Sequence, residues 1–201
     1  MNQRDRECLA EALRFALEAH AEQTRKGRDI PYASHLLQVS GLVLEHGGDA
    51  TLAMAGVLHD ALEDTAHVDG AALRARFGDE VARIVESCTD LLPGDRPDAR
   101  SSWELRKRAY LERLRAADAR TRLVVVCDKV HNLRSLVADL RAEGVETLAR
   151  FTATPAQTRW YFETVRETLC DGLPSRLVDE LDGLLVVLRG FIPVGAASAR
   201  A

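Results

Sequence analysis

The chain has 201 residues, of which 46% are apolar, and it carries a formal net charge of −4. This composition is typical of an ordinary globular protein with a substantial core, and it excludes an intrinsically disordered segment. The acidic balance argues against a general nucleic-acid binder, so any anionic ligand must be recognised by local clusters of basic residues.

The cysteines and the N-terminal residues indicate a reducing compartment. Cys8, Cys88, Cys127 and Cys170 are scattered without a CxxC pair, which fits neither a disulfide framework nor a zinc ribbon. The first residues lead into no apolar signal region, and no uninterrupted apolar stretch is long enough to cross a bilayer. We therefore expect a cytoplasmic protein without a membrane partner, and the sequence leaves its oligomeric state open.

Apolar residues recur at helical spacing through the N-terminal part of the chain. This spacing predicts a first helix that ends before Gly27 and a second helix that runs from Pro31 to Gly47. Asp49 is a suitable N-cap for a third helix, which we expect to continue without interruption to about Asp64.

The remaining pattern is also helical. The apolar run Leu123–Val126 resembles a strand by composition, but its continuation through Leu133 and Leu140 has helical spacing, so one long buried helix is predicted there. Pro and Gly mark residues 91–102 as a loop, and residues 193–201 are expected to be a frayed tail. Further helices are predicted at 71–77, 79–88, 103–116, 155–169 and 175–189.

The segment 57–65 concentrates ionisable side chains among apolar neighbours. It contains His59, Asp60, Glu63 and Asp64. Burying so many ionisable groups costs several kcal/mol unless a partner compensates them, and a divalent metal is a common compensator. On a continuous helix, residues four apart lie on adjacent turns, so one turn would hold a cation and the next a carboxylate above a water molecule. This layout indicates a hydrolase.

His35 and Asp128 are the candidates that complete a metal site with His59 and Asp60. His35 lies near the start of an apolar helix, and Asp128 follows the non-polar run 123–127, where an unpaired carboxylate is costly. Two imidazoles and two carboxylates form a mixed nitrogen and oxygen site suited to Mn²⁺, Fe²⁺ or Zn²⁺.

Structural interpretations of the same residues remain open. His35 alone can be a packed core residue, and His59 can bond Asp128 in a neutral core without a metal. Glu63 and Asp64 can be an acidic helix end at the surface. We interpret the other histidines as surface or core-edge residues, and they are His20, His46, His67 and His131.

Basic and polar residues near these positions are suited to an anionic ligand. Arg25 and Lys26 stand together before the second helix, where a guanidinium can stack on a base while an ammonium meets phosphate. Asn132 and Ser135 follow Asp128 by four and seven residues, so the three share one helix face.

Taken together, these residues resemble the HD superfamily of metal phosphohydrolases, in particular its alarmone-hydrolase branch. That branch comprises the hydrolase domain of RelA/SpoT proteins and the stand-alone small alarmone hydrolases. The matching segments stand in the family's order and span about residues 9–140. They are Arg25-Lys26, Pro31 to His35, Leu58 to Thr65, Phe77-Gly78, Cys88 to Asp90, Arg106-Lys107 and Asp128 to Arg134.

The resemblance implies an all-α HD-domain helical bundle in a single domain at 1–192, with the motif-bearing core at 9–140 and a helical extension at 141–192. It implies a Mn²⁺ ion, with Fe²⁺ or Zn²⁺ as alternatives, held by His35, His59, Asp60 and Asp128. Catalytic roles would fall to Glu63 and Asp64. Contacts to a small-molecule nucleotide would come from Arg25, Lys26, Tyr32, Lys107, Lys129, Asn132 and Ser135.

The implied reaction is removal of the 3′-pyrophosphate from ppGpp or pppGpp, which leaves GDP or GTP. The chain departs from the family's pattern at Lys129 and Ser135, and the spacer 27–30 is longer than in many relatives. These departures leave open the same chemistry on another phosphorylated nucleotide, such as a nucleoside monophosphate or NADPH. A non-catalytic nucleotide-sensing module is the other alternative.

Overall fold

The computed structural model describes residues 1–65, 68–90 and 103–193, except for the side chain of Asp64. Within this part the chain is helical, as predicted, and its only β pairing is an isolated bridge between Thr24 and Pro31. The predicted loop 91–102 and the tail from residue 194 lie outside the described residues. No described helix is both long and apolar enough to span a membrane. The helices are α1 (Gln3–Ala19), α2 (Ala33–Glu45), α3 (Ala50–Leu58), α4 (Ala61–Asp64), α5 (Gly70–Phe77), α6 (Asp79–Cys88), α7 (Trp103–Arg115), α8 (Ala119–Glu143), the 3₁₀ helix η1 (Gly144–Arg150), α9 (Pro155–Leu169) and α10 (Ser175–Phe191).

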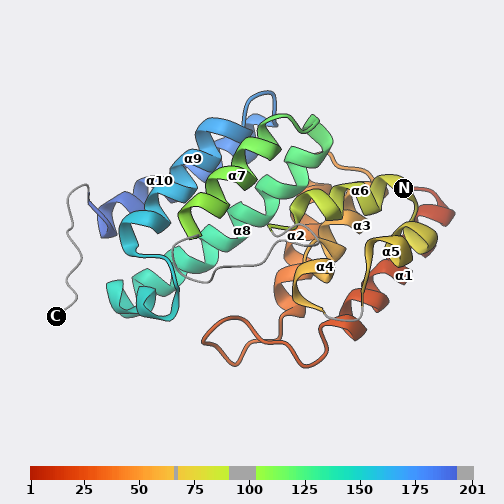
Figure 1. Ribbon diagram of the computed structural model, residues 1–201, viewed down its shortest axis with the longest axis horizontal. Coiled ribbons are helices and arrows are strands. Elements are labelled where there is room, and N and C mark those ends of the chain that lie inside the picture. Colours follow the sequence, from red (N-terminus) through yellow and green to blue (C-terminus); the bar gives the residue numbers. More distant parts are fainter. Residues whose placement is uncertain (66–67, 91–102, 194–201) are drawn as a thin grey trace.

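Helix α8 is central to the fold. It packs against α2, α3 and α6 and also against α9 and α10, so it joins the N-terminal helices to the C-terminal ones (Figure 1). Val124, Val126 and Leu133 on this helix are fully buried. The strand-like run at 123–126 is therefore helical, as its spacing predicts, because a helix that is apolar on all sides is stable only inside a core.

Helices α2 and α3 approach each other closely. Every residue of α3 except Thr51 is buried, and a Cβ placed on Gly56 would lie 3.3 Å from the Cα of Ser40 on α2. The hydroxyl of Ser40 donates a hydrogen bond to the carbonyl of Ala53 at 2.9 Å, which satisfies both buried polar groups. This packing brings the start of α2 beside the end of α3.

The prediction of one helix from Asp49 to Asp64 is wrong, because the helix is interrupted at His59 and Asp60. Helix α3 ends at Leu58, and α4 begins at Ala61. In a continuous helix the carbonyl of Gly56 would accept the amide of Asp60. Instead Nδ1 of His59 lies 2.8 Å from that carbonyl, so the imidazole takes the acceptor that the helix needs. His59 and Glu63 are consequently not on adjacent turns of one helix.

Helix α2 begins at Ala33 and not at Pro31 as predicted. The preceding residues pair with each other instead: the amide of Tyr32 donates to the carbonyl of Gln23 at 2.9 Å, and the amide of Arg25 donates to Ile30 at 2.8 Å. The segment between α1 and α2 is thereby a closed loop, which projects from the helices (Figure 1). It carries Arg25 and Lys26.

Candidate metal centre and adjoining cleft

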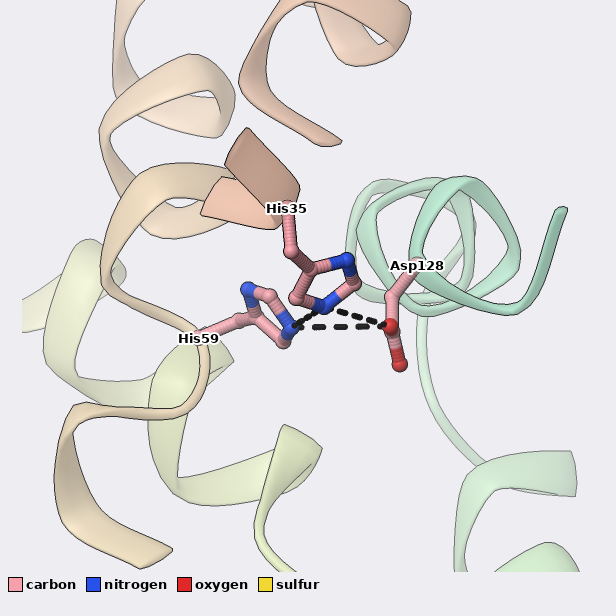
Figure 2. A group of neighbouring side chains, drawn as sticks. All are labelled: His35, His59 and Asp128. Carbon is pink, nitrogen blue, oxygen red and sulfur yellow. Dashed lines mark hydrogen bonds and ion pairs between the residues drawn. The ribbon is translucent and has the colours of Figure 1, made fainter. Parts of the chain in front are cut away.

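Four predicted metal ligands from three parts of the chain meet in the interior. His35 belongs to the first turn of α2, His59 and Asp60 to the break between α3 and α4, and Asp128 to the middle of α8. Figure 2 shows the side chains of His35, His59 and Asp128 pointing toward one another. The two Nε2 atoms of the histidines are 3.1 Å apart. The structure therefore brings together residues that are up to 93 positions apart, the difference between 35 and 128.

The distances in this cluster are those expected of donor atoms around one ion. Nε2 of His35 lies 3.2 Å from Oδ1 of Asp128 and 3.5 Å from Oδ2 of Asp60. Nε2 of His59 lies 2.9 Å from Oδ2 of Asp60 and 3.5 Å from Oδ1 of Asp128. Two donors bound at right angles with bonds of about 2.1 Å are separated by ~3.0 Å. The arrangement is suited to a divalent metal ion, because ligand atoms of His35, His59 and Asp128 all lie within 4.8 Å of one another.

Burial makes the charges of this cluster costly unless they are compensated. The side chains of His35 and His59 are 1% exposed, Asp128 is 7% exposed and Asp60 is 20% exposed. Burial lowers the pKa of His59, but the carboxylates of Asp60 and Asp128 outweigh it and raise that pKa well above its ordinary value. A potential that favours an imidazolium also favours a metal cation in its place.

Contacts behind the cluster orient its donor atoms. The contact of His59 Nδ1 with the Gly56 carbonyl requires a proton on Nδ1, so Nε2 is the ring atom left to bind a cation beside the carboxylates. The hydroxyl of Tyr32 donates to Oδ2 of Asp60 at 2.5 Å. On α8, the amide of Asn132 donates to Oδ1 of Asp128 at 2.5 Å, which confirms that these two residues share a helix face.

Three histidines that were expected at the surface or core edge are buried. His20, His46 and His131 are 4%, 6% and 4% exposed, and His67 lies outside the described residues. His20 stacks on the ring of Tyr32 and contacts Gln23, so the expectation fails because the loop before α2 covers it. His131 contacts the cluster itself: its Nδ1 lies 2.6 Å from Nδ1 of His35, and burial lowers its pKa to about 3.

A cleft of about 1000 Å³ adjoins the metal cluster through Tyr32, Lys129 and His131. The loop before α2, the exposed face of α8, the start of α7 and the segment around α9 form its walls. All seven residues predicted to contact a nucleotide line it, and they are Arg25, Lys26, Tyr32, Lys107, Lys129, Asn132 and Ser135.

Several of these lining residues contact each other across the cleft. The guanidinium of Arg25 donates to Oδ1 of Asn132 at 2.8 Å and lies 5.6 Å from the ring centre of Tyr32. The ammonium of Lys26 lies 5.9 Å from the ring centre of Phe151. The loop thus reaches α8 with one cation and the segment after η1 with the other.

Two lysines of the cleft are paired with buried carboxylates. Lys129 Nζ donates to Oδ2 of Asp128 at 2.6 Å, and Lys107 Nζ donates to Oδ2 of Asp90 at 2.8 Å. Burial lowers the pKa of Lys129, but Asp128 outweighs it and raises that pKa well above its ordinary value. Both lysines therefore provide positive charge at the cleft while they neutralise an interior carboxylate.

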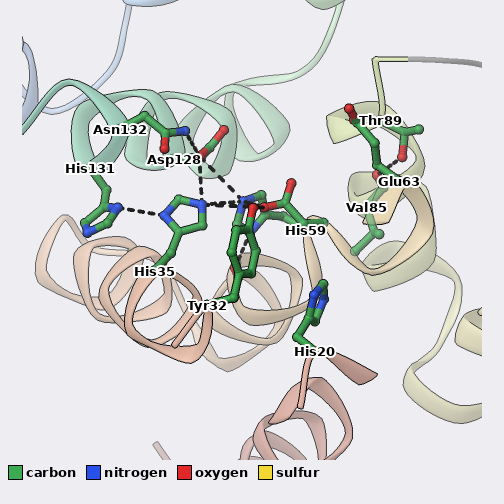
Figure 3. Close-up of polar contacts among 12 residues, drawn as sticks. His20, Tyr32, His35, His59, Glu63, Val85, Thr89, Asp128, His131 and Asn132 are labelled. Atoms are coloured by element: carbon green, nitrogen blue, oxygen red, sulfur yellow. Dashed lines mark hydrogen bonds and ion pairs between the residues drawn. The ribbon is translucent and has the colours of Figure 1, made fainter. Parts of the chain in front are cut away.

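The predicted catalytic carboxylate Glu63 extends from α4 toward the turn after α6. Its Oε2 accepts the amide of Asp90 at 3.1 Å, and Figure 3 shows it beside Thr89. Burial raises the pKa of Glu63 above its ordinary value, although the Asp90 amide acts against it. The side chain of Asp64 lies outside the described residues.

Sequence reasoning assigned no role to Asp90 or to the ion pairs at the mouth of the cleft. Asp90 is 6% exposed and accepts hydrogen bonds from both Arg106 and Lys107. At the mouth, Asp139 on α8 pairs with Arg28 of the loop and with Arg150 of η1. No local pattern marks these pairs, because each joins residues from different elements.

Comparison with known proteins finds a matching family and relatives of similar sequence. The HD domain family profile matches residues 12–154. A probable guanosine-3′,5′-bis(diphosphate) 3′-pyrophosphohydrolase of Synechocystis is 36% identical over 145 residues, which are 72% of this chain but 18% of that protein. The guanosine-3′,5′-bis(diphosphate) 3′-pyrophosphohydrolase MESH1 of Xenopus tropicalis is 34% identical over 135 residues, 66% of this chain and 71% of that protein.

A solved structure has a similar fold. It is that of a metazoan ortholog of SpoT, described as a protein that hydrolyzes ppGpp and plays a role in starvation responses. The two superpose with a TM-score of 0.69 and 27% identity, and the match covers 89% of this chain and 94% of that one.

Proposed function

Because the chain belongs to the HD domain family, we propose that it is a metal-dependent enzyme that removes the 3′-pyrophosphate of ppGpp or pppGpp. One observation carries this proposal: a buried cluster of two imidazoles and two carboxylates lies directly behind a cleft lined by cations and by aromatic rings. A guanosine bearing two diphosphates needs both features. The names of the Synechocystis and Xenopus relatives support the same substrate.

We assign the metal to His35, His59, Asp60 and Asp128, and we propose Mn²⁺ as the ion, with Fe²⁺ and Zn²⁺ as competitors. The donor set supports this assignment because imidazole nitrogen and carboxylate oxygen suit these ions, while no thiolate of the described residues belongs to the cluster. When bound, a divalent ion supplies Lewis-acid chemistry and neutralises charge on the phosphate.

We assign proton transfer to Glu63, assisted by Asp64. The raised pKa of Glu63 brings this carboxyl closer to neutral pH, where an acid-base group works best. The Asp90 amide holds Oε2, so Oε1 is the atom that we expect to exchange a proton with the attacking water or the leaving group.

We assign nucleotide binding to the cleft. Arg25 is held by Asn132 and lies beside the ring of Tyr32, so its guanidinium is oriented for stacking on a purine base. Lys26, Lys107 and Lys129 line the same space and supply positive charge for diphosphate groups.

We also propose that residues 1–192 form one domain. Helix α9 packs on α7 and α8, and α10 packs on α8 and α9, so the C-terminal helices share the core of the helices that carry the centre.

A substrate panel tests the reaction. Purified protein with Mn²⁺ should release pyrophosphate and GDP from ppGpp, and a chelator should abolish the release. The same assay with nucleoside monophosphates and NADPH is the comparison. Phosphate release from one of these without pyrophosphate release from ppGpp would reject the alarmone and keep an HD phosphohydrolase; no turnover of any would favour a nucleotide sensor.

The variant Glu63→Gln tests the catalytic assignment. We expect kcat to fall by about 10²–10⁴-fold, because the amide cannot exchange the proton, while the bound Mn²⁺ remains unchanged. Glu112→Gln is the matched control, because Glu112 is an exposed residue of α7 that pairs only loosely, at 3.6 Å, with Arg115. Equal turnover by both variants would contradict the role of Glu63.

A further inference from the structure

We propose that His131 is a positioning residue for the metal centre, which fixes the ring of His35 by accepting a hydrogen bond from its Nδ1. The proposal rests on the metal site assigned above, but not on the identity of the substrate. The two Nδ1 atoms are 2.6 Å apart, and the ring centres are 4.7 Å apart. Figure 3 shows this contact beside the cluster, with His131 on the side of His35 that faces away from His59.

The contact defines where the protons are. Two imidazole nitrogens at hydrogen-bonding distance need one shared proton, because two protons would clash and two lone pairs would repel. His35 presents Nε2 to His59, Asp60 and Asp128, so a metal bound there takes the lone pair of Nε2. The proton of His35 is then on Nδ1, and His131 must accept it with its own Nδ1 and carry its proton on Nε2.

The position of His131 on α8 makes it effective. It lies three residues after Asp128, on the same side of a helix that is largely buried in the core. One helix thus supplies an oxygen donor directly and orients a nitrogen donor that belongs to α2.

The choice of a histidine as acceptor also suits the charge of the centre. Metal-binding histidines usually donate their second N–H to a carboxylate or a carbonyl. The interior here already holds the charges of Asp60, Asp128 and Lys129. A neutral imidazole orients His35 without adding another buried charge, which would be costly.

The experiment compares Mn²⁺ affinity among variants of the full chain by titration calorimetry. His131→Leu removes the acceptor and should weaken binding by about 10–100-fold. His131→Gln keeps an acceptor oxygen and should recover most of the affinity. The matched control is His46→Leu, because His46 is 6% exposed but lies at the C-terminal end of α2, away from the cluster, and its affinity should equal that of wild type.

A second measurement needs no variant. In protein with ¹⁵N-labelled histidine and Zn²⁺, the nitrogen shifts should show His131 protonated on Nε2 and His35 protonated on Nδ1. A proton on Nδ1 of His131, or wild-type affinity in a folded His131→Leu, would overturn the proposal.

The outcomes also separate this inference from the proposed function. Wild-type protein that binds none of Mn²⁺, Fe²⁺ and Zn²⁺ would reject the metal site and this inference together. Wild-type protein that binds Mn²⁺ but leaves ppGpp intact would reject only the substrate, and the affinities of the variants would still decide the role of His131.

Discussion

Replacing Lys129 by methionine should destabilise the metal-free protein more than the metal-loaded protein. Lys129 is 13% exposed and pairs at 2.6 Å with Asp128, which is 7% exposed. Methionine retains much of the apolar stem but removes the charge. Without metal, the substitution leaves Oδ2 of a buried carboxylate without its cation; with metal, the ion still compensates the same side chain.

The expected magnitudes follow from these contacts. Breaking a buried ion pair by removing one partner costs about 3–5 kcal/mol, and we expect the lower end because Asn132 and the two histidines still contact Oδ1. In the loaded protein the loss is that of one hydrogen bond to a charged group, about 1.5–3 kcal/mol. With about 3 kcal/mol lost without metal and about 2 kcal/mol lost with it, the difference of about 1 kcal/mol requires, by linkage, that Lys129→Met binds Mn²⁺ about 5-fold more tightly than wild type.

The assay is urea unfolding with and without saturating Mn²⁺, and Lys107→Met is the matched control. Lys107 is 17% exposed, pairs with the buried Asp90, and has its ammonium near the rings of Tyr110 and Tyr161, as does Lys129. Its carboxylate partner does not belong to the cluster. The stability that Lys107→Met loses should therefore be the same with and without metal.

Two results would refute this reasoning. An equal loss for Lys129→Met with and without Mn²⁺ would mean that the metal does not compensate Asp128. A metal-dependent loss for Lys107→Met would mean that the ion acts on the whole cleft and not on one carboxylate. Independent calorimetry of Mn²⁺ binding checks the predicted gain in affinity.

Three further predictions concern the cleft wall, the acid side of stability and the core. Gly27→Ala should lower the free energy of unfolding by about 1–2 kcal/mol, because φ at this residue is +68°. It should also raise KM, because the new Cβ would lie 2.9 Å from Cδ of Arg150 in the cleft. Gly172→Ala, where φ is +72° and nothing lies within 4 Å of the new Cβ, should lower stability without changing KM. Burial raises the pKa of Asp90, but the cations of α7 outweigh it and lower that pKa below its ordinary value. The ionised Asp90 therefore stabilises the fold above about pH 4, and this stabilisation is lost as the pH falls through the lower pKa of the folded protein. Asp90→Asn should thus lose less stability than wild type between pH 7 and pH 3 in urea unfolding, and an equal loss would contradict it. Leu133→Ala should cost about 2–5 kcal/mol because Leu133 is fully buried, and a loss under about 1 kcal/mol in the same assay would show that the site collapses around the cavity.

Helical periodicity predicted most of the fold, and it failed where a side chain competes with the backbone. The long helix α8 was predictable because apolar residues keep their spacing from Leu123 to Leu140. The break after Leu58 was not, because nothing in the local pattern says that His59 bonds the Gly56 carbonyl instead of leaving it to Asp60. The interruption belongs to the metal cluster, where local preference gives way to the geometry of the site.

The site was predictable in its ligands and less so in their surroundings. The four ligands were expected together because the motif segments stand in the family's order; they are His35, His59, Asp60 and Asp128. In the structure each imidazole lies within 3.5 Å of both carboxylates. His131 carried a signal that was available: it lies three residues after Asp128, on a helix predicted to be buried. Residues that reach the site from other elements carry no such local signal.

The polar residues of α8 couple the fold to the site. A helix that is buried on most sides can carry Asp128, Lys129, His131 and Asn132 only if other groups compensate them. Those partners come from α2, from the break after α3 and from the loop that holds Arg25. The same contacts that make these residues tolerable inside the core therefore hold the loop and α2 against α8. It follows that metal binding should tighten the loop as well as the centre, because one helix carries the partners of both.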